Sequence, residues 1–567
     1  MSLAQIGAEL DILLEWKKGT AEAMLELPPN PELGDAAFPC FTLAKSLRKA
    51  PQQIASDLAE RFKLEGTEAS AAGPYLNFRF DRSVHSASLL LQAEGQAAAP
   101  NGQTVVIDMS SPNIAKPFGV GHLRSTVIGA ALYRMYTEAG YRTISVNHLG
   151  DWGTQFGKQI TAYKRWGSEE RLKAAPIRES LSLYVRFHDE AVNDPTLETE
   201  ARDWFRRLES GDEEALGLWR YFVDVSLSEF DRMYGRLGVS FDKVLGESFY
   251  NDKMGAVVEE LRTKGLLEES EGAQVVRLDD EEMPPCLILK SDGTTIYPTR
   301  DLATAIYRHD VLQADKLLYV VGAEQTLHFR QVFAVLRKMG RKWASACQHI
   351  PFGLMKFEGK KMSTRKGKVV FLEEVLDEAV ARATAIIEEK NPQLQNREAI
   401  AEAIGIGAIV FGDLKNNRIG EINFSIEEAV QFEGETGPYV QYTHARARSV
   451  LRKAKEGSAE AQNGAAEYES IKASASAYHW DEASWELLKR LCDYQTELQR
   501  GVQRQEPSVV ARYALDLAKM FNRFYHHNKV LSAAAGDKEV RLELTRLTAE
   551  RLRWALDLLG VRSPKEI

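Results

Sequence analysis

The sequence predicts an α/β protein in which a doubly wound parallel-sheet (Rossmann-like) domain lies between a small α+β N-terminal domain and an all-α C-terminal bundle. An apolar run at 104–109 leads through a glycine-containing loop into a segment with helical periodicity, and strand and helix patterns alternate from there to about residue 375. From about 400 onward helical periodicity dominates. A chain of 567 residues, of which 44% are hydrophobic, is long enough to bury several cores.

The first hundred residues are predicted to form a separate domain, 1–100. Within it, AAGPYLNFRF (71–80) combines turn residues with an alternating aromatic pattern and predicts a β-strand. The segment LQAEGQAAAPNGQ (91–103) lacks hydrophobic periodicity and predicts a linker to the next domain. On spacing alone, Tyr75 and Phe78 are core aromatics of this domain.

The central domain, predicted over 101–375, begins with an anion site. In the helix that follows the first strand, Leu123, Val127 and Met135 fall near one face, and Gly140 stands where the helix would end. Unpaired backbone N–H groups and the helix dipole at its N-terminus favour a bound anion. Further apolar strands are expected at 144–147, 286–290 and 317–321.

A long charged helical stretch between about 165 and 280 is predicted to be an insertion that interrupts the sheet. Residues 376–567 are predicted to form the helical domain. Within that domain, 456–477 is biased to Ala, Ser, Gly and Glu and is expected to be a mobile connection.

A second stretch, GKKMSTRKGK (359–368), combines five basic residues with two glycines. Such a composition suits a mobile loop that closes on phosphates. Two phosphate-binding elements so far apart in the sequence indicate a nucleotide held between the two halves of one sheet.

Composition restricts the possible classes of function. The net charge of −9 argues against indiscriminate nucleic-acid binding, although binding itself depends on local basic patches. Four scattered cysteines give neither a zinc motif nor a disulfide framework, and this pattern suits a reducing cytosol. No signal peptide or membrane-spanning run is visible, so we expect a cytoplasmic protein without membrane contact. No metal-ligand cluster is predicted, because adjacent histidines such as His526 and His527 point to different helix faces.

The two phosphate-binding stretches resemble the two signature motifs of class I aminoacyl-tRNA synthetases, and their surroundings resemble the arginyl-tRNA synthetases. The similarity covers nearly the whole chain in family order, through SPNIAKP (111–117), NHLGDWGTQFG (147–157), SDGTTIYPTRDLATAIYR (291–308), VGAEQTLHFRQ (321–331) and ETGPYVQYTHARAR (435–448). It implies an arginine–tRNA ligase that forms arginyl-adenylate from arginine and Mg-ATP and transfers the arginyl group to the 3′-terminal ribose of tRNA(Arg). It also implies that tRNA must be present for the first step.

For the chemistry on ATP, His122 lies just inside the helix start and is placed to donate to a phosphate oxygen. The alternative is a purely structural role, in which His122 only caps the helix. Gly119 and Gly121 let the backbone approach the nucleotide. The resemblance adds Lys116, Met362 and Ser363 to the ATP site, and Lys360, Lys361 and Arg365 are expected to neutralise the leaving pyrophosphate.

Two positions depart from the family pattern. The first signature usually begins with histidine, but this sequence has Gly119, so one phosphate donor is missing. The second signature has Thr364 in place of its second lysine, for which Lys360, Lys366 or Lys116 are candidate substitutes. Gly119 keeps open an alternative from another class, a catalytically silent RNA-binding paralogue of the synthetase fold.

Recognition of arginine requires acids that face a guanidinium, because a planar permanent cation pairs with carboxylates in bidentate geometry. Tyr297 and Asp301 are four residues apart and share one face if the segment is helical. The competing interpretation of Asp301 is a salt bridge to Arg300 or Arg308. By resemblance, the arginine contacts also include Asn113, Glu247 and Gln325.

The resemblance further implies that the N-terminal domain grips the elbow of the tRNA and that the helical bundle binds the anticodon. Tyr75 would then stack on an unpaired base and Asn77 would read the edge of that base. Without a visible heptad seam, we expect a monomer. No tightly bound cofactor is expected beyond the substrate ATP with its Mg²⁺.

Overall fold

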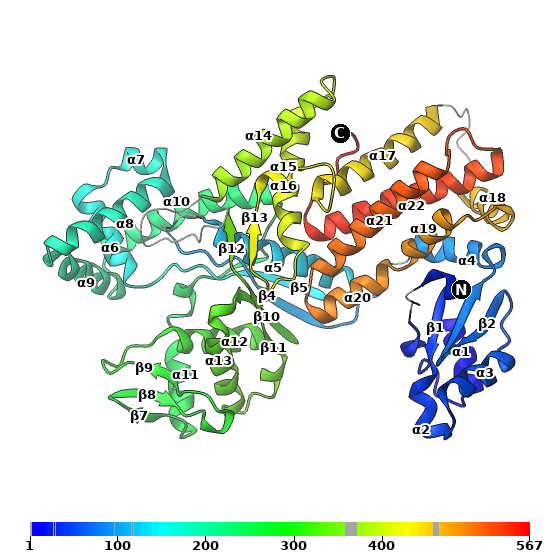
Figure 1. Cartoon of the computed structure of the whole chain (residues 1–567). Coiled ribbons are helices and arrows are strands. Elements are labelled where there is room, and N and C mark those ends of the chain that lie inside the picture. Colours follow the sequence, from blue (N-terminus) through cyan, green and yellow to red (C-terminus); the bar gives the residue numbers. More distant parts are fainter. Residues whose placement is uncertain are drawn as a thin grey trace.

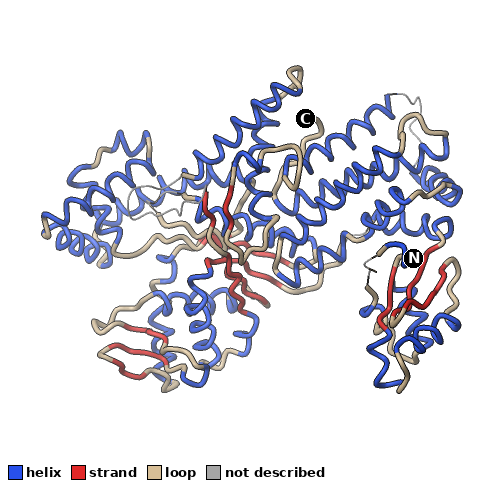
Figure 2. The backbone as a smooth tube through the Cα atoms, viewed as in Figure 1, coloured by secondary structure: helices blue, strands red, loops and turns tan. Residues whose placement is uncertain are grey.

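The computed structural model describes residues 3–26, 28, 30–95, 97–114, 116, 118–357, 371–456 and 464–567, with side chains omitted at 3, 4, 31 and 464–469. Figure 1 shows a central sheet with a group of helices on one side of it and, on the other, a helical bundle that reaches the N-terminal domain. Figure 2 shows that helices make up most of the molecule. In the described part of the chain, no helix combines the length and apolarity needed to cross a bilayer.

The N-terminal domain is a small antiparallel sheet covered by helices. Its strands run in the order β1-β3-β2, and Gly73, with φ +59°, forms part of the turn between β2 and β3. The prediction of a strand within 71–80 is confirmed by β3. The elements are β1 (Ala36–Pro39), β2 (Thr67–Ala72), β3 (Tyr75–Phe80), α1 (Leu3–Leu13), α2 (Ala44–Leu47), α3 (Pro51–Arg61) and α4 (Arg82–Glu94). Helix α4 contains Leu91–Glu94, so the predicted linker begins four residues too early.

Asp35 fastens this domain to the helical bundle. Its Oδ1 accepts hydrogen bonds from Trp485 Nε1 and Lys489 Nζ, each at 2.9 Å, and its Oδ2 accepts from the Phe80 N–H at 2.9 Å. Burial raises the pKa of the Asp35 carboxyl, but the charge of Lys489 and these hydrogen bonds outweigh burial and hold the pKa below its usual value. The contact therefore needs the ionised carboxylate.

Replacing Asp35 by asparagine should lower the free energy of unfolding by about 1–3 kcal/mol, because the half-buried Lys489 loses one of its two carboxylate partners and keeps only Glu486. A carboxyl group whose folded pKa is depressed contributes stability above its unfolded pKa and loses it as the pH falls through the folded value. The difference in the free energy of unfolding between the parent and Asp35→Asn should thus be largest at neutral pH and should disappear in acid. Urea unfolding followed by tryptophan fluorescence measures it. Asp57→Asn, which removes an exposed ion pair to Lys49 in the same domain, is the control and should change little.

The central sheet is parallel throughout, with the strand order β11-β10-β4-β5-β6. The chain runs from β4 to β5 on one side, whereas β10 and β11 lie on the other side of β4. The order therefore reverses at β4, and in such sheets ligands bind outside the carboxyl ends of the strands at this point. The strands are β4 (Thr104–Asp108), β5 (Arg142–Asn147), β6 (Lys243–Val244), β10 (Lys316–Gly322) and β11 (Cys347–Phe352).

Alternate residues of β4 enter two separate cores, as a doubly wound sheet requires. Val105 and Ile107 pack with residues of α5 (Val120–Glu138), whereas Val106 packs with residues of α12 (Tyr297–Asp310) and α13 (Thr326–Lys338). Helix α5 ends at Glu138, and Gly140 follows two residues later with φ +87°. The predicted end of this helix is therefore confirmed. The predicted fold class is confirmed.

Two strand predictions were incomplete. The run 286–290 forms β9 (Cys286–Leu289), but β9 belongs to a separate antiparallel sheet with β7 (Glu268–Ser270) and β8 (Ala273–Val276). A short strand after residue 400, β13 (Ile422–Phe424), was missed, and it pairs with β12 (Met355–Phe357). Strand periodicity does not specify the partner of a strand, and three residues are too few to show a period.

The predicted insertion is helical up to residue 237 and then gives way to β6, helix α11 (Met254–Thr263) and the antiparallel sheet. It packs as a group of helices to one side of the central sheet (Figure 1). Its helices are α6 (Gln155–Trp166), α7 (Glu169–Ala174), α8 (Pro176–Asn193), α9 (Thr196–Glu209) and α10 (Glu213–Leu237).

The C-terminal half contains the predicted helical bundle. Its helices are α14 (Leu372–Lys390), α15 (Arg397–Leu414), α16 (Ile426–Ala429), α17 (Gly437–Glu456), α18 (Gly464–Ala477), α19 (Glu482–Cys492), α20 (Tyr494–Arg504), α21 (Ser508–His527) and α22 (Ala535–Leu559). Helix α18 occupies most of the segment expected to be a mobile connection, and the carbonyl of Ala475 in α18 accepts from Ser86 Oγ of α4 at 3.1 Å. Residues 457–463 of that segment lie outside the described part.

A buried ion pair joins the bundle side to the helix of the first signature. Arg124 Nε of α5 lies 3.1 Å from Asp413 Oδ1 of α15, and both side chains are 1% exposed. Arg124 Nη1 also donates to the carbonyls of Gly353 and Gly420, at 2.7 and 3.1 Å. Burial raises the pKa of Asp413 to about 6 even with Arg124 beside it. The position of α5 is thus fixed from the C-terminal half of the chain.

Candidate active site

The chain makes an unusual turn directly after β4. Ser110 and Ser111 have φ of +73° and +52°, a left-handed conformation that non-glycine residues rarely adopt. Ser111 Oγ donates to Asp108 Oδ1 at 2.9 Å, and Ser110 Oγ lies 2.7 Å from the Tyr234 hydroxyl of α10. Backbone strain of this kind concentrates at ligand sites. The turn brings the first signature to the carboxyl end of β4.

His122 is held by a contact that leaves one ring nitrogen free. Gly119 is the N-cap of α5, and its N–H donates to His122 Nδ1 at 3.2 Å. Burial, with a smaller effect of the Lys116 charge, lowers the pKa of the imidazole to about 4, so the ring is neutral at physiological pH. Because Nδ1 accepts, the proton of the neutral ring lies on Nε2. The capping role and a donor role at Nε2 are therefore compatible.

The backbone at Gly119 is also paired with the start of α14. Gly119 forms an antiparallel bridge with Phe371, and the Leu372 N–H donates to the Phe118 carbonyl at 3.1 Å. The second signature residues Lys360, Lys361, Met362, Ser363 and Arg365 lie outside the described residues. Their described flanks are β12, which ends at Phe357, and Phe371, which lies beside Gly119.

Asn113 lies where two loops pair across the sheet edge. It bridges Gly150, whose N–H donates to the Pro112 carbonyl at 3.0 Å. A Cβ at position 150 would come within 2.3 Å of Asn113 Oδ1, so a larger residue there would displace the Asn113 amide. In contrast, a Cβ at Gly121 would meet nothing within 4 Å, which leaves open space beside the α5 N-terminus.

The predicted arginine pocket gathers three acids beside two cations. Glu247 begins a 3₁₀ turn (Glu247–Tyr250), and its Oε2 lies 3.3 Å from Arg300 Nη1. Burial raises the pKa of the Glu247 carboxyl to about 7, while Arg300 acts in the opposite direction and Asp151 and Asp301 add to the rise. Burial also lowers the pKa of the Lys116 ammonium, and the Glu247 charge partly offsets that effect.

Tyr297 and Asp301 both belong to α12, which confirms their shared helical face. Tyr297 is the first residue of the helix and is 63% exposed. The competing interpretation of Asp301 is not realised. Its Oδ2 pairs with His328 Nε2 at 2.5 Å, whereas Arg300 pairs with Glu247.

The other candidate partner, Arg308, forms a buried pair with Asp108 at 2.7 Å. Arg308 is therefore paired with Asp108 in the protein interior and not with Asp301.

Gln325 ends a 3₁₀ turn (Ala323–Gln325) at the carboxyl end of β10 and is exposed. The structure thus brings Lys116 and Asp301 each within electrostatic reach of Glu247. Sequence reasoning missed His328, although it lies three residues after Gln325 in the motif VGAEQTLHFRQ. That spacing places it on the same side of the helix start.

The two residues predicted to contact the tRNA elbow differ in exposure. Tyr75 is half-buried, with its ring edge-on to Phe41 at 5.8 Å between centroids. Asn77, in the central strand β3, is only 3% exposed in this ligand-free chain. The assignment of both to RNA contact stays a prediction, and Tyr75 is the better placed of the two.

Comparisons with known proteins agree with this site. A family model described as "tRNA synthetases class I (R), catalytic domain" matches residues 85–426, one described as "Arginyl tRNA synthetase N terminal domain" matches 3–80, and one described as "DALR anticodon binding domain" matches 440–567. The fold is that of a class I aminoacyl-tRNA synthetase.

Similar proteins with known names identify the family within this class. The chain is 51% identical to the arginine–tRNA ligase of Clostridium perfringens, over 98% of this chain and 97% of the relative. It is also 51% identical to that of Latilactobacillus sakei, over 96% and 95% of the two chains. The solved arginyl-tRNA synthetase of Thermus thermophilus superimposes with a TM-score of 0.81 at 28% identity, covering 96% of both chains. The protein belongs to the arginyl-tRNA synthetase family.

Proposed function

We propose that the protein is an arginine–tRNA ligase, and that Asp301, Glu247 and Tyr297 select arginine while the α5 N-terminus and the second signature handle ATP. The observation that carries this proposal is that Lys116 lies within electrostatic reach of both Glu247 in the acidic cluster and His122 at the N-terminus of α5, where the order of a parallel sheet reverses. Family membership supports the ligase activity.

In the first step, a carboxylate oxygen of arginine attacks the α-phosphorus of ATP and the bond to the bridging oxygen of the β-phosphate breaks. Pyrophosphate leaves and arginyl-adenylate forms. The protein mainly positions the reactants and stabilises charge on the phosphate oxygens. His122 Nε2–H donates to a phosphate oxygen, and Lys360, Lys361 and Arg365 neutralise the pyrophosphate. Mg²⁺ arrives with ATP as part of the substrate.

In the second step, a hydroxyl of the 3′-terminal ribose of tRNA(Arg) attacks the arginyl carbonyl carbon, and AMP leaves with the electrons of the cleaved bond. Tyr75 is proposed to contact the tRNA elbow. The N-terminal domain and the bundle lie side by side (Figure 1), which allows one tRNA to reach both. We infer a cytoplasmic monomer. The buried, unpaired state of Cys40, Cys286, Cys347 and Cys492 suits a reducing compartment.

One aminoacylation assay tests the proposal directly. Purified full-length protein, Mg-ATP, a tRNA(Arg) transcript and each of several amino acids should give charged tRNA with arginine alone, and pyrophosphate exchange should require tRNA. A catalytically silent RNA-binding paralogue would bind the transcript without consuming ATP. Charging with another amino acid would overturn the assignment of the acidic pocket.

The Glu247 carboxyl makes arginine binding pH-dependent. Its pKa of about 7 in the ligand-free protein should fall when a permanent cation binds beside it, because the cation favours the ionised form. Arginine binding at or below about pH 7 should therefore release a proton, and the affinity should rise as the pH increases through 7.

Calorimetry in two buffers with different ionisation enthalpies measures the proton release. Glu247→Gln should abolish it. Glu269→Gln, which changes an exposed acid on β7, should leave it intact. Proton uptake by the parent, or unchanged release by Glu247→Gln, would remove Glu247 from the arginine pocket.

A further inference from the structure

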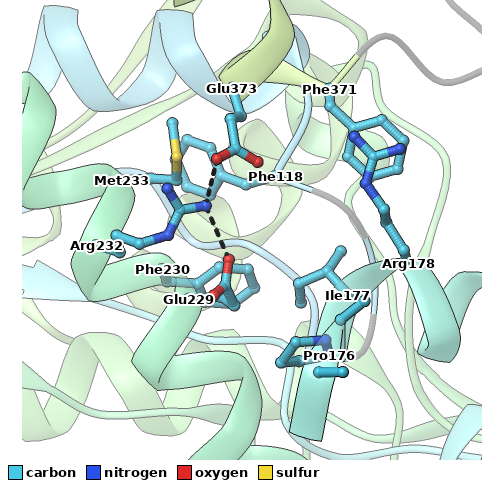
Figure 3. Close-up of a pocket in the computed structure, with 12 residues that line it drawn as sticks. Phe118, Pro176, Ile177, Arg178, Glu229, Phe230, Arg232, Met233, Phe371 and Glu373 are labelled. Atoms are coloured by element: carbon cyan, nitrogen blue, oxygen red, sulfur yellow. Dashed lines mark hydrogen bonds and ion pairs between the residues drawn. The ribbon is translucent and has the colours of Figure 1, made fainter. Parts of the chain in front are cut away.

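A cavity of about 230 Å³ lies between the helical insertion and the start of α14, and Phe118 is among the residues that line it (Figure 3). Its apolar wall includes Phe118, Ile177, Phe230 and Phe371, and two arginines from the insertion reach across it, Arg178 of α8 and Arg232 of α10. Neither arginine belongs to the signatures or to the acidic pocket. The contacts of Arg178 and Arg232 with the start of α14 account for their positions beside the cavity.

Both arginines hold the first residues of α14. The Arg178 guanidinium lies over the Phe371 ring, 4.7 Å from its centroid, and Arg178 Nη2 is 2.9 Å from Glu374 Oε1. Arg232 Nη2 is 2.7 Å from Glu373 Oε1 and 3.1 Å from Glu229 Oε2 (Figure 3). Two different helices of the insertion thus contact Phe371, Glu373 and Glu374, which lie together at the start of α14.

Those gripped residues are in direct contact with the backbone that carries His122. Phe371 bridges Gly119, and the Leu372 N–H donates to the Phe118 carbonyl. Gly119 in turn donates to His122 Nδ1, and the Phe118 ring lies 5.5 Å from the imidazole. A displacement of Phe371 therefore reaches His122 through two consecutive contacts, the backbone bridge to Gly119 and the hydrogen bond from the Gly119 N–H to the imidazole.

We propose that Arg178 is a positioning residue for His122, acting through Phe371 and Gly119, so that the helical insertion controls the geometry of the first signature. This inference rests on the proposed function. The Arg178–Glu374 pair is about half exposed on both sides, and such pairs contribute little to overall stability. Its placement on a segment that bridges Gly119 points to alignment of the reacting groups, where small misplacements have large effects on rate.

The test is tRNA-dependent, arginine-dependent ATP–pyrophosphate exchange by the full-length protein. Arg178→Ala should lower kcat on the order of tenfold, with the KM values for arginine and ATP unchanged within about twofold and the melting temperature unchanged within about 2 °C. Arg178→Lys keeps the charge but not the planar stack and should be intermediate.

Arg186→Ala is the matched control. Arg186 lies on the same helix, is similarly exposed, stacks on Trp166 at 4.5 Å and pairs with Glu190 at 3.8 Å. Within the described residues, no hydrogen bond, ion pair or ring contact joins it to α14. It should retain full kcat. The double variant Arg178→Ala/Glu374→Ala should be no slower than Arg178→Ala within about twofold, because both changes break one contact.

Normal kcat in Arg178→Ala, an equal loss in Arg186→Ala, or a loss matched by a lowered melting temperature would each overturn the positioning role. Absence of arginine-dependent exchange in the parent protein would instead overturn the proposed function. The two failures are therefore distinguishable.

Discussion

Replacing His122 by alanine is expected to lower the rate of arginyl-adenylate formation by about a hundredfold or more. This is the usual loss when an enzyme is deprived of a preorganised hydrogen-bond donor that stabilises negative charge in the transition state. The neutral ring keeps its proton on Nε2 because Nδ1 accepts from the Gly119 N–H. Pre-steady-state measurement of adenylate formation, at saturating arginine, ATP and tRNA, gives the rate directly. A loss of less than threefold would remove His122 from the mechanism.

Two amide variants of His122 distinguish hydrogen-bond donation to the substrate from capping of α5. In His122→Asn, the amide oxygen can still accept from the Gly119 N–H, but no donor reaches the position of Nε2. In His122→Gln, the longer side chain can place an N–H near the Nε2 position but loses the cap. If donation matters, asparagine should be as slow as alanine and glutamine should recover part of the rate. The reverse order would mean that His122 only caps α5.

Asp301→Asn is expected to raise the arginine KM by about a hundredfold, because truncating one partner of a desolvated charge pair costs about 2–5 kcal/mol. The ATP KM should change by less than about twofold, since the proposed partner of Asp301 is the arginine guanidinium and not the nucleotide. Steady-state charging kinetics with each substrate varied in turn measure both constants.

Asp310→Asn is the matched control for this variant. Asp310 ends the same helix and pairs with His309 at 2.7 Å, so it reproduces an Asp–His contact outside the pocket. Its kinetics should match those of the parent. Equal arginine KM and rate in Asp301→Asn and the parent would defeat the assignment of Asp301 to the substrate.

Local features of the site could be predicted from the sequence because they depend on short-range geometry. The β4–loop–α5 unit follows from a strand pattern, two glycines and a helical period within 40 residues. The shared face of Tyr297 and Asp301 follows from the helical repeat. In contrast, the sheet that contains β9 depends on pairing with β8, which no periodicity in β9 itself records.

The partners of charged residues were the least predictable part. Arg300 is adjacent to Asp301, but neighbours on a helix point about 100° apart, so Arg300 turns to Glu247 and leaves Asp301 to His328. Arg308 pairs with Asp108, which lies 200 residues earlier. Such contacts arise only when the sheet brings distant segments together, and composition alone contains no signal for them.

The buried pair between Arg124 and Asp413 has a consequence for any attempt to dissect the chain into independent pieces. A fragment ending near residue 375, where strand patterns give way to helical ones, would lack both the counter-ion of Arg124 and helix α15, which supplies that counter-ion. It would also remove β13, the partner of β12. A minimal autonomous fragment must therefore extend past Phe424, and the nucleotide-handling half of the molecule is not separable from the start of its helical half.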